Sequence, residues 1–197
     1  MQVTRRHFCG LTCSTLALGA TGCAVNPATG ESGLMLVSSD QERRIGAEEH
    51  PKIIKEFGGV YDDPRVAGYA ASIGGRLAQV TEQPDTSYTF TVLDNPIVNA
   101  FALPGGYVYI TRGLMALAEN EAELAGVLGH EIGHVVARHS SQRRSTAILA
   151  QIGAGLLGAA TGSSAIGNLA ATGAGVYLRS FSRDQELEAD RLGVRYL

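Results

Sequence analysis

The sequence predicts a mostly helical α+β domain in which a small β-sheet lies beside one long amphipathic helix. Apolar residues recur at helical spacing between residues 121 and 138, whereas Tyr88–Leu93 alternates apolar side chains with threonine, as a half-buried strand does. A second strand, Tyr107–Thr111, follows the turn Pro104-Gly105-Gly106. With 197 residues, 45% of them hydrophobic, the chain is long enough for one domain with a sizeable core.

Residues 1–22 predict an export signal of the twin-arginine and lipoprotein type. Arg5 and Arg6 precede an uncharged, modestly apolar run that is too short to span a bilayer comfortably, which takes about 20 residues. The segment Ala20–Cys23 resembles a lipoprotein cleavage box, although such boxes usually have Leu at the position of Ala20. Cleavage there would make Cys23 the lipid-bearing N-terminus of a periplasmic, membrane-anchored protein. The alternatives are an uncleaved membrane anchor and an ordinary secretion signal.

Residues 23–39 predict a tether to a domain formed by residues 40–197. Helical patterns cover Asp40–Phe57 and Pro64–Val80, and Gly58-Gly59 separates them. Pro51 should bend or restart the first helix, so we expect His50 to be a surface residue near a break rather than a metal ligand.

Two histidines, His130 and His134, lie one turn apart on the long helix, which we expect to run from its N-cap Asn120 to about Arg138. Residues four apart lie about 40° from each other around a helix, so both imidazoles can reach one ion. Glu131 borders that ion without being a ligand. A zinc hydrolase needs this combination of two neutral nitrogens and an adjacent proton acceptor. The alternative is a buried histidine pair with ordinary hydrogen bonds, which Glu131 and the helical context disfavour.

Three glycines, Gly126, Gly129 and Gly133, are grouped on one side of these histidines. Glycine costs helix stability, about 1 kcal/mol relative to alanine. The grouping therefore predicts that another backbone approaches this side of the helix closely.

A catalytic zinc site usually has three protein ligands, and the best third candidate is Glu186. The segment Ser182–Asp190 predicts another capped helix, on which Glu186 and Asp190 share a face. Glu186 would complete a site for one zinc ion per chain, and Asp190 would accept the free ring N–H of a ligand histidine. Taken alone, the segment would be an ordinary solvated acidic helix. The rival Glu188 lies about 200° round from Glu186, so both cannot face the metal.

A third histidine and the cysteines are the other candidate ligands. His139 turns about 140° away from His134 if the helix continues, so we expect it to be packed against the core or to support a ligand. Cleavage before Cys23 would remove the other two cysteines, Cys9 and Cys13, which leaves histidine and carboxylate for the metal.

The segment Ala147–Gly175 separates the two metal-binding motifs and is rich in alanine and glycine. Its many glycines weaken any single long helix, and Gln151 interrupts its most apolar run. We expect a mobile flap or helical hairpin over the cleft rather than a transmembrane span.

Three ordered motifs, Asn99–Leu114, Gly129–Ser140 and Ser182–Gly193, resemble the HtpX and CaaX-prenyl-protease family of zinc metalloendopeptidases, which are gluzincins. The resemblance covers nearly everything after Cys23 and is greatest to the soluble periplasmic lipoprotein branch, the BepA-like members. It implies a zincin-like metalloprotease domain. Its zinc ligands match His130, His134 and Glu186 in this sequence.

The resemblance also implies the remaining roles. Glu131 matches the general base, which takes a proton from water and passes it to the leaving amine. Asp190 matches the residue that supports a ligand histidine. The region Asn99–Ala102 resembles an edge strand along which peptide substrate lies, with Asn99 as a substrate contact; turn capping is its structural alternative. The family's oxyanion donor is expected beyond Leu197, so we expect the domain at 40–197 to be truncated at its C-terminus.

These patterns predict a zinc-dependent metalloendopeptidase that is exported and lipid-anchored. Its expected substrates are polypeptides, namely unfolded or misassembled envelope proteins, and its expected role is envelope protein quality control. The alternative is a zinc-stabilised periplasmic chaperone or assembly factor without proteolysis. Nucleic acid is not an expected partner, because 16 basic and 19 acidic residues give a net charge of -3 and no basic tract occurs.

Overall fold

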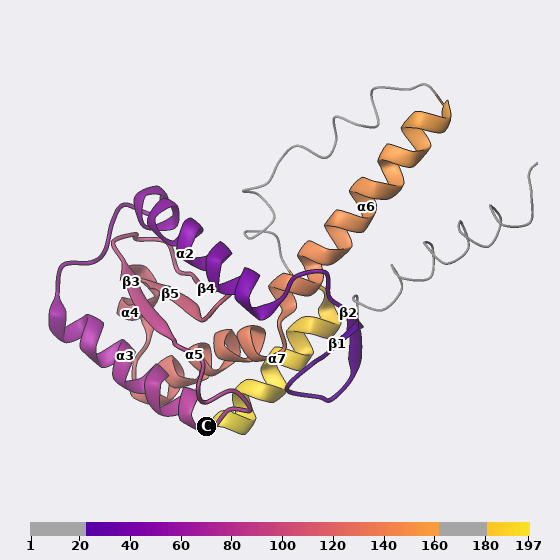
Figure 1. Ribbon diagram of the computed structural model, residues 1–197. Helices are drawn as coiled ribbons and strands as arrows, with labels where there is room; N and C mark the ends of the chain where they lie inside the picture. Colours follow the sequence, from indigo (N-terminus) through magenta and orange to yellow (C-terminus); the bar gives the residue numbers. More distant parts are fainter. Residues whose placement is uncertain (1–22, 162–180) are drawn as a thin grey trace, which may run out of the picture.

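The computed structural model describes residues 23–161 and 181–197 (Figure 1). The predicted export signal and the later part of the predicted flap, residues 162–175, lie outside the described residues. The elements in chain order are β1 (Cys23–Val25), β2 (Ser32–Leu34), α2 (Ser39–Glu56), α3 (Pro64–Gln79), β3 (Thr89–Leu93), β4 (Ala100–Leu103), β5 (Tyr107–Thr111), α4 (Arg112–Leu117), α5 (Glu121–Val136), α6 (His139–Thr161) and α7 (Arg183–Tyr196). The predicted mostly helical α+β fold is therefore confirmed.

The sheet has the strand order β3-β5-β4, with β5 parallel to β3 and antiparallel to β4. Successive side chains of a strand point to opposite faces. Val108 and Ile110 of β5 accordingly belong to one apolar cluster, while Tyr109 between them belongs to another. Both faces of the sheet are thus covered by helices.

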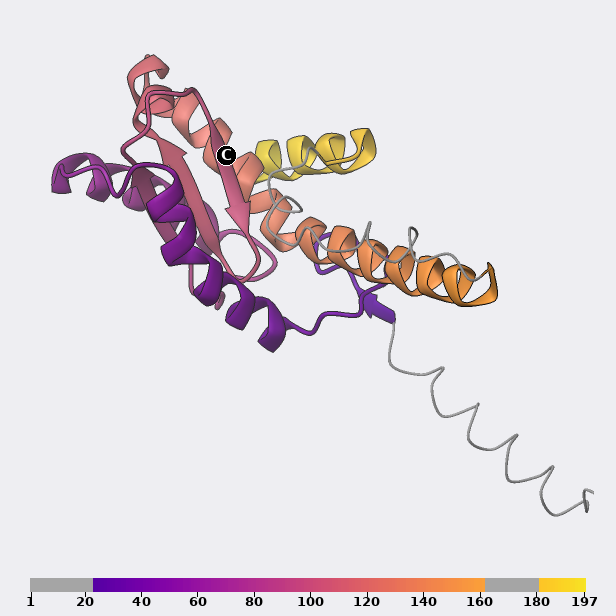
Figure 2. The same cartoon turned by 90° about the horizontal axis from the view of Figure 1, so that it is seen from above.

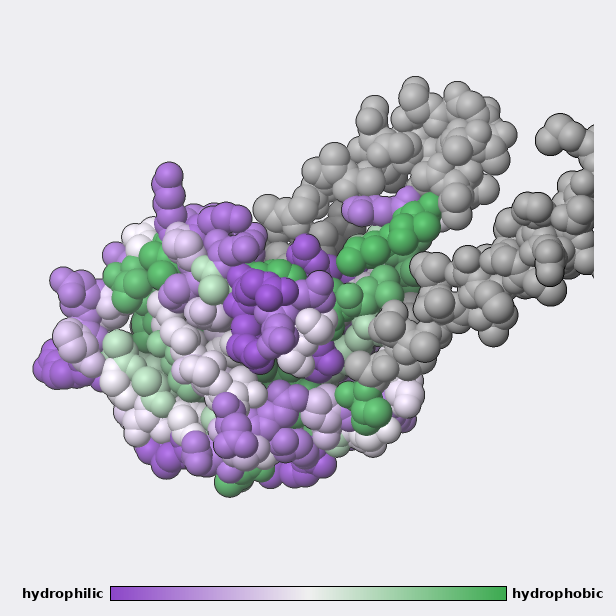
Figure 3. All heavy atoms as spheres, viewed as in Figure 1, coloured by the Kyte–Doolittle hydropathy of each residue, from purple (hydrophilic) through white to green (hydrophobic). Residues whose placement is uncertain are grey.

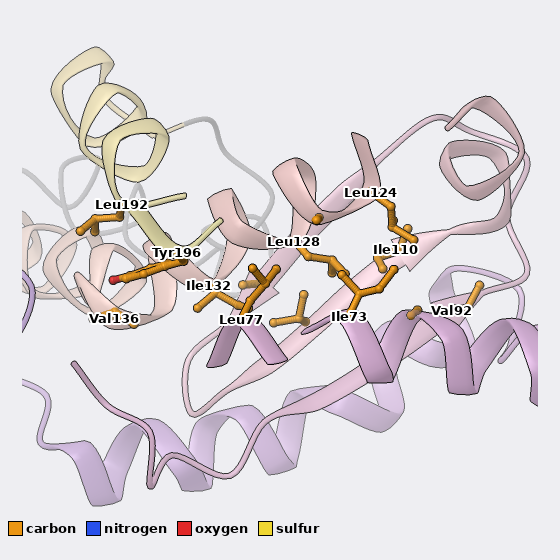
Figure 4. Packing of buried hydrophobic residues seen from close by; sticks show 14 of the residues in the cluster. Ile73, Leu77, Val92, Ile110, Leu124, Leu128, Ile132, Val136, Leu192 and Tyr196 are labelled. Atoms are coloured by element: carbon orange, nitrogen blue, oxygen red, sulfur yellow. The ribbon is translucent and has the colours of Figure 1, made fainter. Parts of the chain in front are cut away.

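One face of the sheet packs against α3 and α5, with α7 next to α5 (Figure 4). Leu128 and Ile132 of α5 are completely buried there, against Ile73 of α3 and Ile110 of β5. Leu192 and Tyr196 extend the same cluster onto α7. This core holds α5 and α7 together and so places the two motif-bearing helices side by side.

The opposite face packs against α2 through Ile53 and Phe57. Helix α2 runs without interruption through Pro51, so the predicted break is absent. His50 is half-buried, with its Nδ1 2.6 Å from the hydroxyl of Tyr109, and is therefore not the surface residue we expected. Burial of Ile53 and Phe57 after the proline holds the helix together although one backbone donor is missing.

Residues 23–39, predicted to be a tether, contain the antiparallel hairpin β1–β2. The chain after it is anchored by the buried Met35 and Val37 and by a hydrogen bond from the Leu36 N–H to Ser145 Oγ on α6. Neither the hairpin nor α4, whose N-cap is Thr111, was predicted from the sequence.

Helix α6 projects away from the rest of the described structure (Figures 1 and 2). Leu149 and Ile152 are exposed in the part of α6 whose side chains are described, and Figure 3 shows hydrophobic surface at the base of this helix. Among residues 23–161 and 181–197, no helix has the length and apolar character needed to cross a membrane.

Helices α5 and α7 approach each other through glycines, as the sequence predicted for two of the three. A Cβ on Gly129 would lie 3.1 Å from the carbonyl oxygen of Gly193, and one on Gly133 would lie 3.0 Å from that of Ala189. A Cβ on Gly126 would meet nothing within 4 Å, so the prediction was wrong at that position. The close contact brings His130 and His134 within reach of the first turns of α7.

Candidate metal centre

The two histidine-bearing turns and the third candidate ligand are positioned by capped helices. Asn120 accepts a hydrogen bond from the Glu123 N–H and starts α5, while Ser182 and Gln185 form a capping box that starts α7. Capping fixes where each helix begins, and therefore which side chains face the partner helix.

His130, His134 and Glu186 meet between α5 and α7. Their nearest ligand atoms all lie within 4.8 Å of one another. The two Nε2 atoms are 3.0 Å apart, and Glu186 Oε2 is 3.3 Å from His130 Nε2 and 3.8 Å from His134 Nε2. The structure therefore brings together the three ligands that the sequence predicted, although Glu186 lies more than fifty positions after the two histidines.

This set of atoms fits zinc. Ligand bonds of about 2 Å arranged tetrahedrally give ligand–ligand separations of about 3.3 Å, close to the distances above. The nitrogen–nitrogen contact points the same way, because two imidazole lone pairs directed at one another repel unless a cation lies between them. Two imidazoles and one carboxylate also leave a fourth position, as a hydrolytic zinc site requires.

Both imidazoles are held by partners on their other nitrogen. His130 Nδ1 lies 2.9 Å from Asp190 Oδ1, so this carboxylate can accept its ring N–H. His134 is only 3% exposed, and its Nδ1 lies 2.8 Å from Nδ1 of His139. The pKa of His134 is lowered to about 2, mainly by burial and then by the charges of His130, His139 and Arg143. This imidazole is therefore neutral, as metal binding requires.

Glu131 lies beside the three candidate ligands and is buried, with 7% of its surface exposed. Burial and, second, the negative charge of Glu186 raise the pKa of Glu131 to about 8 in the metal-free protein. A buried carboxyl group with a pKa near neutrality is suited to accept and release a proton at physiological pH. A bound cation would favour its ionised form.

The chain between α5 and α6 reverses in a way that helix spacing did not predict. Helix α5 ends at Val136, and Arg138 has a φ of 59°, in the left-handed region. His139 consequently begins a new helix and returns to His134, instead of lying about 140° round a continuous helix. Burial of His139 agrees with the expectation that it packs or supports a ligand.

Glu188 faces away from the candidate ligands, as its position on the helical wheel predicted. Its Oε2 lies 3.3 Å from His139 Nε2, and its Oε1 accepts a hydrogen bond from Asn26 Nδ2. The sequence carried no signal that Asn26, 162 positions earlier, would contact this residue.

Phe181 is a further neighbour that sequence patterns did not indicate. Its ring stacks on that of His134, with centroids 4.0 Å apart, and the Arg143 guanidinium lies 4.2 Å from the same phenyl ring. Phe181 directly precedes Ser182, the N-cap of α7. The residue that leads into this helix therefore covers one face of the candidate ligand His134.

The predicted substrate contact, Asn99, immediately precedes β4 and is half-buried. Its carbonyl oxygen accepts hydrogen bonds from Thr111 N and Oγ1. Strand β4 is an edge of the three-stranded sheet and packs against α5, which confirms that this segment runs extended beside the histidine-bearing helix.

The chain is similar to known peptidases. The beta-barrel assembly-enhancing protease of Escherichia coli (strain K12) is 32% identical over 180 residues, which are 87% of this chain and 37% of that protein. The protein of the same name from Yersinia pestis has the same identity and coverage. The mitochondrial metalloendopeptidase OMA1 of Bos taurus is 27% identical over 190 residues, which are 89% of this chain and 36% of that protein.

The chain thus spans little more than a third of the length of these relatives. Residues 64–197 match peptidase family M48. This range contains α5, α7 and the candidate ligands His130, His134 and Glu186. On that match, the chain belongs to peptidase family M48.

Proposed function

We propose that this protein is a zinc-dependent metalloendopeptidase with His130, His134 and Glu186 as the three ligands of one zinc ion. The observation that carries the proposal is the meeting of these side chains between α5 and α7, with Glu131 buried beside them. Membership of peptidase family M48 supports a hydrolytic role for such a centre.

Each side chain has a distinct task in this proposal. Zinc bound here supplies a Lewis acid that activates water at neutral pH and polarises a peptide carbonyl. Glu131 accepts the proton of the attacking water and passes it to the leaving amine. Asp190 holds the ring of His130 through its Nδ1, which leaves Nε2 free for the metal.

Polypeptides are the proposed substrates, bound along β4, the edge strand of the sheet. An edge strand pairs with peptide backbone and so accepts many sequences. The position of β4 beside α5 would place such a peptide near the candidate ligands, with Asn99 at the start of the strand as a contact.

The proposed location is the bacterial periplasm, with the mature chain anchored to a membrane by lipid on Cys23. The N-terminal sequence features support export and lipidation. Relatives named beta-barrel assembly-enhancing proteases support a role in envelope protein quality control, with unfolded or misassembled envelope proteins as substrates.

Metal analysis and one conservative variant test the proposal. The purified protein should contain one zinc per chain, and His130→Ala should lose it. Glu131→Gln should keep the zinc and lose cleavage of an unfolded polypeptide by a factor of at least about 100. Glu119→Gln, an exposed carboxylate just before α5, is the matched control and should cleave normally.

Three results would contradict the proposal: a wild-type protein without zinc, undiminished cleavage by Glu131→Gln, or no cleavage by a zinc-loaded wild type. A zinc-stabilised chaperone would be supported by a different result. In that case neither the wild type nor Glu131→Gln would cleave the unfolded polypeptide, and both would prevent its aggregation equally well.

A further inference from the structure

A line of hydrogen bonds leads from His134 away from the candidate metal position. His134 Nδ1 lies 2.8 Å from His139 Nδ1, His139 Nε2 lies 3.3 Å from Glu188 Oε2, and Asn26 Nδ2 lies 2.8 Å from Glu188 Oε1. Its members come from α5, α6, α7 and the turn of the β1–β2 hairpin. His139 is completely buried, and Asn26 is 6% exposed.

The polarity of this line follows from its carboxylate. An ionised carboxylate only accepts hydrogen bonds, so the His139 Nε2 must carry the proton that faces Glu188. A neutral imidazole has one N–H, so the His139 Nδ1 is then an acceptor and the His134 Nδ1 must donate to it. The His134 Nε2 is left with its lone pair free, and this atom faces His130 and Glu186.

Asn26 has a fixed orientation that suits this arrangement. Its Oδ1 accepts a hydrogen bond from the Ala28 N–H at 2.9 Å, which assigns the amide oxygen to that side. The NH₂ group therefore points at Glu188 and donates to the oxygen that His139 does not use. Both carboxylate oxygens of Glu188 thus have a donor.

The two histidines of the metal centre are supported differently. His130 contacts the carboxylate of Asp190 directly, and that side chain is 63% exposed. On its Nδ1 side, His134 reaches the carboxylate of Glu188 through a second imidazole, His139, and the contact between the two imidazoles is buried. Because His134 and His139 are 3% and 0% exposed, their contact is shielded from solvent, and the ring of His134 has little freedom to take another partner.

We propose that His139 and Glu188 are positioning residues that hold His134 in the tautomer with a free Nε2, and that Asn26 orients Glu188 for this task. The inference rests on the zinc site proposed above. It assigns to the N-terminal hairpin, which begins at the proposed lipid-bearing Cys23, a structural link to a metal ligand through Glu188 and His139.

Nuclear magnetic resonance of the ring nitrogens tests the tautomers directly. In the zinc-loaded protein with ¹⁵N-labelled histidine, the proton of His139 should be on Nε2 and that of His134 on Nδ1. A His139 proton on Nδ1 would overturn the proposal, because this atom could then not accept from His134.

Zinc affinity, measured by chelator competition, tests the positioning role. His139→Phe keeps a ring of similar size but removes the acceptor, and should weaken zinc binding about 10- to 100-fold. Asp184→Asn, which changes an exposed carboxylate on α7, is the control and should bind zinc as the wild type does. Unchanged affinity in His139→Phe would sink the proposal.

A donor–acceptor exchange separates this role from mere packing. Glu188→Gln alone leaves one acceptor oxygen for two donors, the Asn26 NH₂ group and the His139 Nε2 N–H. Asn26→Asp alone places two carboxylates together, so each single variant should weaken zinc binding about tenfold. The double variant restores one donor and one acceptor across the contact and should recover most of the lost affinity. A double variant as weak as the worse single one would contradict the role of Asn26.

The failures of the two proposals are distinguishable. A wild-type protein that binds no zinc overturns both. A wild type that binds one zinc, together with unaffected His139→Phe and Glu188→Gln variants, overturns only the positioning role.

Discussion

At the scale of single residues, Glu131 combines burial with a negatively charged neighbour. In the metal-free protein the folded state retains the Glu131 proton up to about pH 8, whereas an unperturbed glutamate ionises near 4.5. Between these values the folded state binds more protons than the unfolded chain, so this group lowers stability as pH rises.

Glu131→Gln removes this titration. We expect the free energy of unfolding of the metal-free variant, relative to that of the wild type, to rise between about pH 4.5 and 8 and to level off above. Urea unfolding of both proteins in the presence of a chelator measures the difference. A difference that does not vary with pH would show that Glu131 is ionised in the folded state. Saturating zinc should reduce the effect, because the cation favours the carboxylate.

At the scale of elements, the metal centre depends on how closely α7 approaches α5. A Cβ at Gly193 would lie 2.8 Å from the His130 backbone nitrogen and 3.0 Å from the Gly129 carbonyl carbon. Both neighbours are main-chain atoms of α5, so neither can move aside as a flexible side chain would. The helices would have to separate, and Glu186 and Asp190 would move with α7.

Gly193→Ala should therefore lower stability by about 1–3 kcal/mol and weaken zinc binding about tenfold or more. Gly126→Ala on α5 is the matched control: its Cβ meets open space, and alanine should raise stability by up to about 1 kcal/mol. Thermal unfolding and chelator competition report the two effects. Equal behaviour of the two variants would mean that the α5–α7 contact tolerates a methyl group.

At the scale of the whole molecule, Arg138 connects three parts of the chain. Its Nε donates to Glu42 of α2 at 2.8 Å, and its Nη2 donates to the Val37 carbonyl oxygen in the segment after the hairpin. The side chains of Arg138 and Glu42 are only 9% and 11% exposed. The reversal that returns His139 to His134 is thereby tied to elements near the N-terminus.

Removing one partner of a buried ion pair leaves the other charge uncompensated. Arg138→Met should cost about 3–5 kcal/mol of stability, and adding Glu42→Met should recover much of this loss. Arg112→Met, which breaks the exposed pair with Asp94, should cost less than about 1 kcal/mol. Denaturant unfolding of the four proteins provides the comparison, and a cost for Arg138→Met as small as that for Arg112→Met would contradict the argument.

Much of the candidate site could be predicted from local patterns. The four-residue spacings of His130 with His134 and of Glu186 with Asp190 place each pair on one helix face, and the caps Asn120 and Ser182 start those helices. These features depend on residues close together in the sequence, so they are visible before any tertiary contact is known.

Tertiary structure decided the features that depend on distant partners. His139 supports His134 only because the chain reverses at Arg138, and that reversal is stabilised by Glu42 from another helix. Helix α2 continues through Pro51 because Ile53 and Phe57 are buried against the sheet. The amino-acid sequence by itself determined which side chains lie on each helix face, whereas packing of the faces determined which of them meet, because burial energy is shared between residues far apart in the chain.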